Sequence, residues 1–117
     1  MRLLVFGSRS WTDEFMVGVV LQGFLFVSQA IGEPLTVIDG KARGADSLAG
    51  AWYGGADGLH GIHEDVKMVM EGHPNIAVGF VDGLDPHGYP NSRGSADMFM
   101  RLLDAGVPTY LVTRSKP

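Results

Sequence analysis

Short apolar runs alternate along the chain with longer stretches in which apolar residues recur at helical spacing. The runs end at glycine, proline or polar residues and are continuous, as in strands buried on both faces of a sheet. They predict four strands, at residues 3–6, 35–38, 75–81 and 107–112. The stretches between them predict four helices, at about residues 14–30, 45–53, 62–71 and 95–105. Strand and helix alternate from end to end, which predicts one parallel sheet with right-handed crossovers.

The first expected helix is unusual because no formal charge occurs from residue 15 to residue 31. Such a stretch approaches the roughly 17–25 residues of a membrane span. Glycines and polar residues interrupt it, however, and strand patterns flank it, so a membrane helix is disfavoured. We expect a helix buried on more than one side, with part of its surface covered by a second subunit. The chain is therefore predicted to form a homo-oligomer, a dimer or higher, through residues 15–31.

The 117 residues fit one domain that spans 1–117. We expect a Rossmann-like, three-layer α/β/α architecture around a small parallel sheet of about four to five strands. Residues 54–61 are rich in glycine and carry no strand pattern. We therefore predict no strand directly after Trp52, so that the strand at 35–38 lacks a neighbour on one side and an edge strand of the sheet is missing.

Composition places the chain among soluble globular proteins, since 45% of residues are hydrophobic, 19% are charged and the net charge is −4. This acidic balance disfavours binding to a nucleic-acid backbone, which requires a basic surface. The chain has no cysteine, which excludes disulfides, a thiolate nucleophile and cysteine-ligated zinc. The apolar residues at the N-terminus are too few for the core of a signal peptide, so a cytoplasmic location is expected.

Three loops rich in glycine and small polar residues follow predicted strands or open predicted helices. They contain Gly7, Ser8 and Arg9; then Gly40, Lys41, Arg43, Gly44 and Asp46; and finally Gly94, Ser95 and Asp97. Glycine lets the backbone approach an anion, a helix N-terminus offers free N–H groups, and arginine is a bidentate phosphate donor. Ligands of parallel sheets lie where such loops meet, at the carboxyl ends of the strands. We therefore expect these residues to bind a phosphate-bearing ligand.

Each loop alone also has an ordinary structural explanation. The first could be a tight turn with an exposed arginine, and Asp46 could simply cap a helix. Ser92 or Ser95 could be an N-cap, and Asp97 could complement the helix dipole. The recurrence of the same chemistry after successive strands is what favours a ligand site.

Two other groups of residues are given structural interpretations. His60 and His63 are spaced to share one face of a helix, but no further ligand is fixed by spacing, so no metal site is predicted. Trp11 and Trp52 are expected to pack in the interior rather than to stack on a base.

Together these motifs resemble the YspA-like branch of the SLOG superfamily, Rossmann-like domains related to the DNA-processing protein DprA and to the LOG phosphoribohydrolases. The resemblance covers nearly the whole chain. It rests on Gly7-Ser8-Arg9-x-Trp11-x-Asp13, Gly40-x-Ala42-Arg43-Gly44-Ala45-Asp46-x-x-Ala49-x-x-Trp52 and Gly94-Ser95-Ala96-Asp97-Met98. It implies a bacterial or phage protein that senses or sequesters a nucleotide or nucleotide-derived small molecule. No cofactor beyond that ligand is implied.

Departures from the family pattern bear on catalysis. Glu64 and Asp65 stand where relatives carry arginine and asparagine, and Met98 stands where the phosphoribohydrolases carry a glutamate. These changes favour binding over chemistry. The alternative is a nucleoside-monophosphate phosphoribohydrolase that cleaves an N-glycosidic bond with Asp97 and Arg43. A DNA-binding module, which the relation to DprA also suggests, is disfavoured by the net charge.

Overall fold

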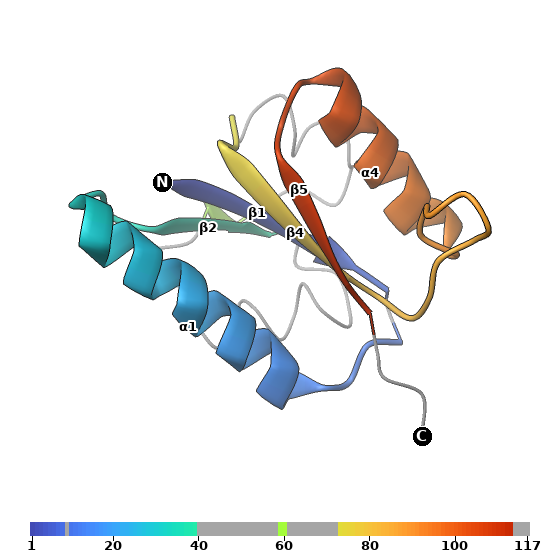
Figure 1. The fold of residues 1–117 in the computed structure, drawn as a ribbon, viewed down its shortest axis with the longest axis horizontal. Helices are drawn as coiled ribbons and strands as arrows, with labels where there is room; N and C mark the ends of the chain where they lie inside the picture. The colour runs from blue at the N-terminus through green and yellow to red at the C-terminus, as the bar shows by residue number, and fades with distance from the viewer. Residues whose placement is uncertain (9, 40–58, 61–72, 114–117) are drawn as a thin grey trace.

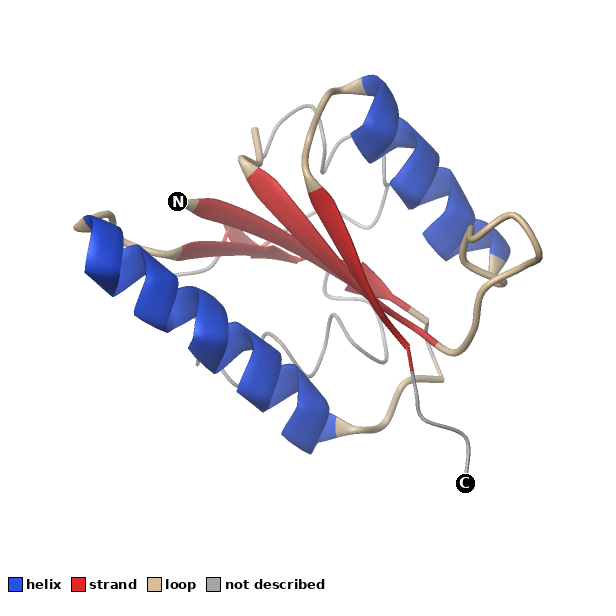
Figure 2. Ribbon diagram, in the orientation of Figure 1, coloured by secondary structure: helices blue, strands red, loops and turns tan. Residues whose placement is uncertain are grey.

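Five parallel strands form the sheet of the computed structural model, which describes residues 1–8, 10–39, 59–60 and 73–113. In chain order the elements are β1 (Arg2–Gly7), α1 (Glu14–Ile31), β2 (Thr36–Asp39), β3 (Leu59–His60), β4 (Ile76–Val81), α4 (Arg93–Asp104) and β5 (Thr109–Thr113). The order across the sheet is β3-β2-β1-β4-β5. α1 covers one face and α4 the other, so the described elements form three layers (Figure 1, Figure 2). The predicted α/β fold is confirmed.

β1 lies in the middle of the sheet and is buried on both faces, because side chains of a strand alternate between its two sides. Leu3 and Val5 join the cluster under α1, whereas Leu4 and Phe6 join the cluster under α4. A continuous apolar run is therefore the pattern that this position requires.

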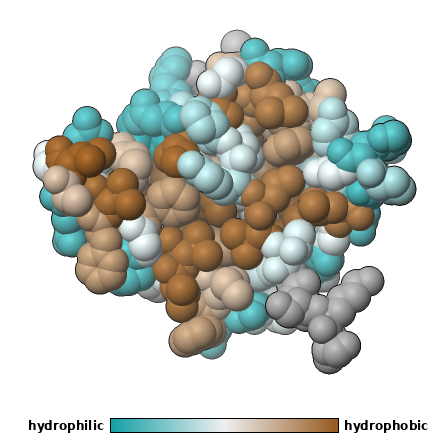
Figure 3. All heavy atoms as spheres, in the orientation of Figure 1, coloured by the Kyte–Doolittle hydropathy of each residue, from teal (hydrophilic) through white to brown (hydrophobic). Residues whose placement is uncertain are grey.

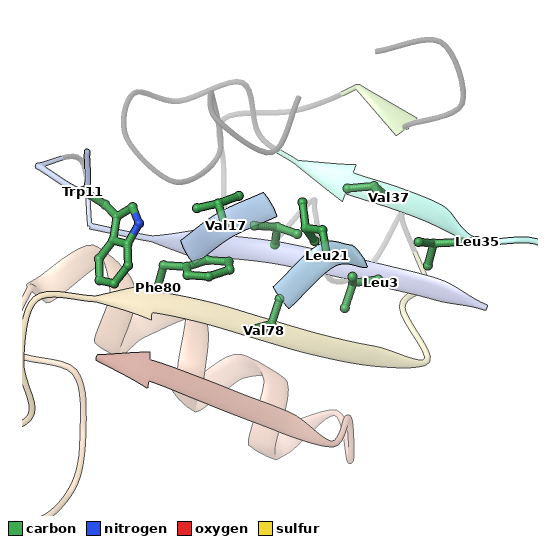
Figure 4. Packing of buried hydrophobic residues seen from close by; sticks show 9 residues of the cluster. Leu3, Trp11, Val17, Leu21, Leu35, Val37, Val78 and Phe80 are labelled. Carbon is green, nitrogen blue, oxygen red and sulfur yellow. The ribbon is translucent and has the colours of Figure 1, made fainter. Parts of the chain in front are cut away.

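The cluster under α1 extends to the carboxyl end of the sheet through Trp11 (Figure 4). Its ring centroid lies 5.5 Å from that of Phe80, and its indole Nε1 donates a hydrogen bond to the Asp13 carbonyl at 3.1 Å. Only 1% of Trp11 is exposed. Trp11 is therefore an interior packing residue, as predicted, while Trp52 lies outside the described residues.

α1 begins and ends at residues that satisfy its terminal backbone groups. The carboxylate of Asp13 accepts a hydrogen bond from the Met16 N–H at 3.0 Å, as an N-cap does. At the other end Gly32 adopts the left-handed conformation at φ 72, and its N–H donates to the Gln29 carbonyl. The helix predicted at residues 14–30 is thus one residue longer. α4 begins two residues before its predicted start.

β3 corrects the prediction that an edge strand is missing. Leu59 and His60 pair in parallel with Ile38 and Asp39, on the side of β2 that was expected to be open. Two residues inside a glycine-rich stretch form no readable periodicity, so the sequence pattern does not reveal them. The predicted helices at 45–53 and 62–71 lie outside the described residues.

Within one chain α1 is buried along one side only, which differs from the expected burial on several sides. Its buried residues are Val17, Leu21 and Ser28. Apolar side chains remain on the molecular surface where α1 and β5 lie (Figure 3). By length and composition α1 is the one helix of the described ranges that could cross a membrane, although its inner side belongs to the core.

Candidate functional site at the carboxyl ends of β1 and β4

The carboxyl ends of β1 and β4 lie side by side where the connections of the sheet diverge. From β1 the chain passes through α1 to β2, which lies beside β1 on the side away from β4. From β4 it passes through α4 to β5, which lies beside β4 on the side away from β1. The two helices lie on opposite faces (Figure 1). In an open parallel sheet such a switch point leaves a crevice between the diverging loops, and ligands bind there. The ends of β1 and β4 are therefore the candidate site.

Serine and aspartate side chains join the two strand ends. The Ser8 N–H donates to the Phe80 carbonyl at 2.9 Å, and the Asp82 N–H donates to the Ser8 hydroxyl at 3.2 Å. The Ser10 hydroxyl donates to the Asp82 carboxylate. Ser8 is buried, whereas Ser10 and Asp82 are exposed. The loop after β1 is thus held against the loop after β4, with a hydroxyl–carboxylate pair at the surface.

Asp82 and Ser10 are site residues that the sequence reasoning did not select. Asp82 is the first residue after the buried strand β4, so its position at the carboxyl edge follows once the sheet is known. A polar residue directly after a continuous apolar run is the signal that could have found it. Ser10 carries no comparable signal, because its partner lies 72 residues away in the sequence.

The N-terminus of α4 opens near this edge without a side-chain cap. Ser92 occupies the N-cap position in an extended conformation, but its hydroxyl accepts no hydrogen bond from the helix. Its carbonyl accepts the Ala96 N–H at 2.9 Å, the first bond of the helix. The first turn contains no acidic residue, and a Cβ added at Gly94 would meet nothing within 4 Å. The positive end of this helix is therefore accessible and not neutralised by its own side chains.

Ser95 is buried in the first turn of α4. It is 4% exposed, and its hydroxyl has no hydrogen-bond partner in the described part of the chain. Ser95 shares the buried side of α4 with Met98 and Leu102, which pack against β1. A buried hydroxyl without a partner is unfavourable by about 1–3 kcal/mol, so its presence here calls for an explanation.

The loop between β4 and α4 is a compact hairpin. The Asp85 carboxylate accepts hydrogen bonds from the N–H groups of His87 at 2.8 Å and Tyr89 at 3.0 Å. Leu84 and Pro90 form an antiparallel bridge, and the Tyr89 ring packs on Phe99 of α4 at 5.6 Å. The loop therefore fixes where α4 begins relative to β4.

The structure brings together part of the predicted site. Gly7 and Ser8 end β1 at the switch point, and Gly94 and Ser95 lie in the first turn of α4. Asp97 lies beyond that turn and is exposed, so it does not complement the dipole in the first turn as predicted. Arg9, Gly40, Lys41, Arg43, Gly44 and Asp46 lie outside the described residues. Within the described ranges no group of three metal-ligating side chains occurs.

Comparison with family models, curated proteins and solved structures finds no match to this chain. The resemblance to the YspA-like branch of the SLOG superfamily therefore rests on the sequence motifs alone.

Proposed function

We propose that the carboxyl edge at β1 and β4 binds a nucleotide-derived, phosphate-bearing small molecule, which the protein senses or sequesters. One observation carries the proposal: the N-terminus of α4 has no side-chain cap, and the buried Ser95 hydroxyl in its first turn has no partner in the described part of the chain. The Ser10–Asp82 pair belongs to the loops at the same edge.

The first turn of α4 supplies the groups that a phosphate requires. N–H groups at a helix N-terminus point outward along the axis, and the helix dipole favours an anion there. Gly94 leaves open space beside these N–H groups. The Ser95 hydroxyl, which has no partner in the described part of the chain, is available to donate a hydrogen bond to a phosphate oxygen. The cost of burying this hydroxyl is then offset when the ligand binds.

Asp82 indicates how such a ligand is oriented. Its carboxylate repels a phosphate but accepts hydrogen bonds from hydroxyl and amine groups. Ser10, bound to it, is a second polar group at the same surface. We therefore propose that the phosphate lies toward α4 and that the sugar or base lies toward Asp82.

The remaining positive charge comes from the loops after β1 and β2. Arg9, Lys41 and Arg43 follow these neighbouring strands in the sequence, and parallel strands end at the same edge. The resemblance to SLOG domains implies the same ligand class, on the same motifs. The net charge of −4 favours a nucleotide over a nucleic acid as the ligand.

Native mass spectrometry of gently purified protein tests the proposal directly. We expect a fraction of the protein to carry a bound small molecule with the mass of a nucleotide or a nucleotide derivative. Calorimetric titration with the molecule so identified then gives its affinity. Absence of any bound species, together with no heat from a panel of mononucleotides and dinucleotides, would contradict the proposal.

Ser95→Ala separates a ligand-binding role of the hydroxyl from a structural one. Removing a buried hydroxyl that lacks a partner should leave stability unchanged or raise it by about 1 kcal/mol, while ligand affinity falls by about 1–3 kcal/mol. Ser28→Ala is the matched control, because Ser28 is equally buried but its hydroxyl donates to the Leu25 carbonyl at 2.7 Å. That variant should bind the ligand normally. Equal ligand affinity of wild type and Ser95→Ala would remove Ser95 from the site.

A further inference from the structure

The outer side of α1 is an exposed apolar surface at the centre of a long uncharged segment. Phe15 is 78% exposed, Phe26 62% and Val19 51%, although all three lie on a helix that packs against the core. Two residues of α1, Val20 and Phe24, lie nearer the sheet and pack against its core. The outer surface is therefore separate from the contacts that hold α1 in the fold.

This outer surface carries a shallow, open groove along the helix. The groove is lined by Glu14, Phe15, Gly18, Val19, Gln22, Gly23 and Phe26. The two phenylalanines stand at its ends, and the two glycines leave the floor open between them. A Cβ added at Gly23 would meet nothing within 4 Å. Small residues between large ones allow another helix to approach closely.

The groove has a symmetry that is visible in the residue numbers. Phe15 and Phe26 are equally distant from a point between residues 20 and 21, and so are Gly18 and Gly23. When a second helix lies antiparallel to the first about that point, Phe15 lies opposite Phe26 of the other helix and Gly18 lies opposite Gly23. A two-fold interface requires this kind of self-complementary surface, in which the same patch serves both partners.

We propose that a second copy of this chain occupies the groove, with the two α1 helices antiparallel about a two-fold axis that passes between residues 20 and 21. The glycines then lie at the crossing, where the backbones come closest. Phe15 of each copy lies beside Phe26 of the other, so aromatic pairs close both ends of the interface. This interaction is independent of the ligand proposed for the carboxyl edge.

Charge and area favour a second copy over other occupants. No lysine or arginine occurs on α1, whereas a helix that lies on an anionic membrane surface is typically rich in both. The exposed apolar side chains of the groove are Phe15, Val19 and Phe26. They offer on the order of 400 Å² per copy, so a dimer buries about 800 Å², the size of a weak, transient interface. The dimer should accordingly be reversible, with a dissociation constant in the micromolar range.

Sedimentation velocity over a range of concentrations tests the interface. Wild-type protein should change from monomer to dimer as its concentration rises to high micromolar values. Phe15→Glu and Phe26→Glu should each raise the dissociation constant about tenfold or more, because the glutamate becomes buried without a partner. Leu103→Glu is the matched control, since Leu103 is a 48% exposed apolar residue on α4, and it should dimerise normally.

Gly23→Ala distinguishes the proposed interface from general damage to the fold. Alanine favours helix more than glycine does and meets nothing in the monomer, so the thermal midpoint should rise. The added methyl group keeps the backbones apart at the crossing, so the dissociation constant should rise as well. A more stable fold that dimerises less is an outcome that misfolding cannot produce.

Three results would overturn the proposal. The first is wild-type protein that stays monomeric at high micromolar concentration. The second is a dimer that Phe15→Glu, Phe26→Glu and Gly23→Ala leave unchanged. The third is monomeric protein that binds phosphatidylcholine vesicles through Phe15 and Phe26, which would assign this surface to a membrane.

Discussion

At the scale of single residues, Gly79 shows how a missing side chain shapes the core. It lies in β4 opposite Phe6 of β1. A Cβ at position 79 would overlap the Phe6 ring and lie 2.6 Å from its Cε2 atom. The Phe6 ring, which is 4% exposed, therefore occupies the space that any other residue at position 79 would need.

Gly79→Ala should destabilise the fold by about 1–3 kcal/mol, as overpacking of a core does. The penalty should shrink in the Phe6→Leu background, because the smaller side chain vacates part of the contested space. Gly94→Ala is the control and should not destabilise the fold, since its added methyl group is unopposed and alanine favours helix. Urea unfolding gives the free energy of unfolding of Gly79→Ala, Phe6→Leu, the double variant and Gly94→Ala. Equal penalties in the wild-type and Phe6→Leu backgrounds would show that the Phe6 ring is not the obstacle.

At the scale of elements, the two described helices begin in different ways. The side chain of Asp13 caps α1, whereas Ser92 stands at the N-cap of α4 without capping it. The first turn of α1 is thus satisfied by a side chain of the protein itself. The open end of α4 is consistent with the proposal that a ligand supplies its missing partners.

Asp13→Ala should therefore destabilise the protein by about 1 kcal/mol, which is typical for loss of an N-cap hydrogen bond. Ser92→Ala should have a much smaller effect in ligand-free protein, because its hydroxyl accepts no helix N–H. Thermal unfolding of both variants beside the wild type is sufficient. A Ser92→Ala variant as unstable as Asp13→Ala would mean that Ser92 caps α4 in solution.

The elements also show what sequence alone can predict. Continuous apolar runs identified β1, β2, β4 and β5, because each is long enough to show its pattern. β3 was missed because two residues have no periodicity. Part of the site was predicted from loop composition. The hydrogen bond between Ser10 and Asp82 could not be predicted from the sequence, because it depends on which strands become neighbours in the sheet.

At the scale of the whole molecule, the geometry of α4 bears on the alternative hydrolase. In that alternative, Asp97 is the carboxylate that acts at the sugar. Asp97 is exposed and follows the first turn, whereas Ser95 is on the side of α4 that packs on the sheet. Asp97 and Ser95 are two residues apart, which places them on different sides of a helix.

We therefore expect no release of free base when the protein is incubated at length with AMP, GMP, CMP or UMP. Chromatography of the mixture detects the base, with Asp97→Ala protein incubated in parallel. Base release by the wild type that the Asp97→Ala variant lacks would establish the hydrolase and displace the binding proposal.

The central position of β1 has a consequence for how the protein is made. β1 leaves the ribosome before β4, yet the Arg2 N–H bonds to the side chain of Asn75, 73 residues later, just before β4 begins. At about 5–20 residues per second, roughly 4–15 s of synthesis separate the two strands. During that interval Leu4 and Phe6 have neither β4 nor α4 to cover them. The nascent chain thus exposes apolar side chains that favour aggregation until β4 and α4 have been made.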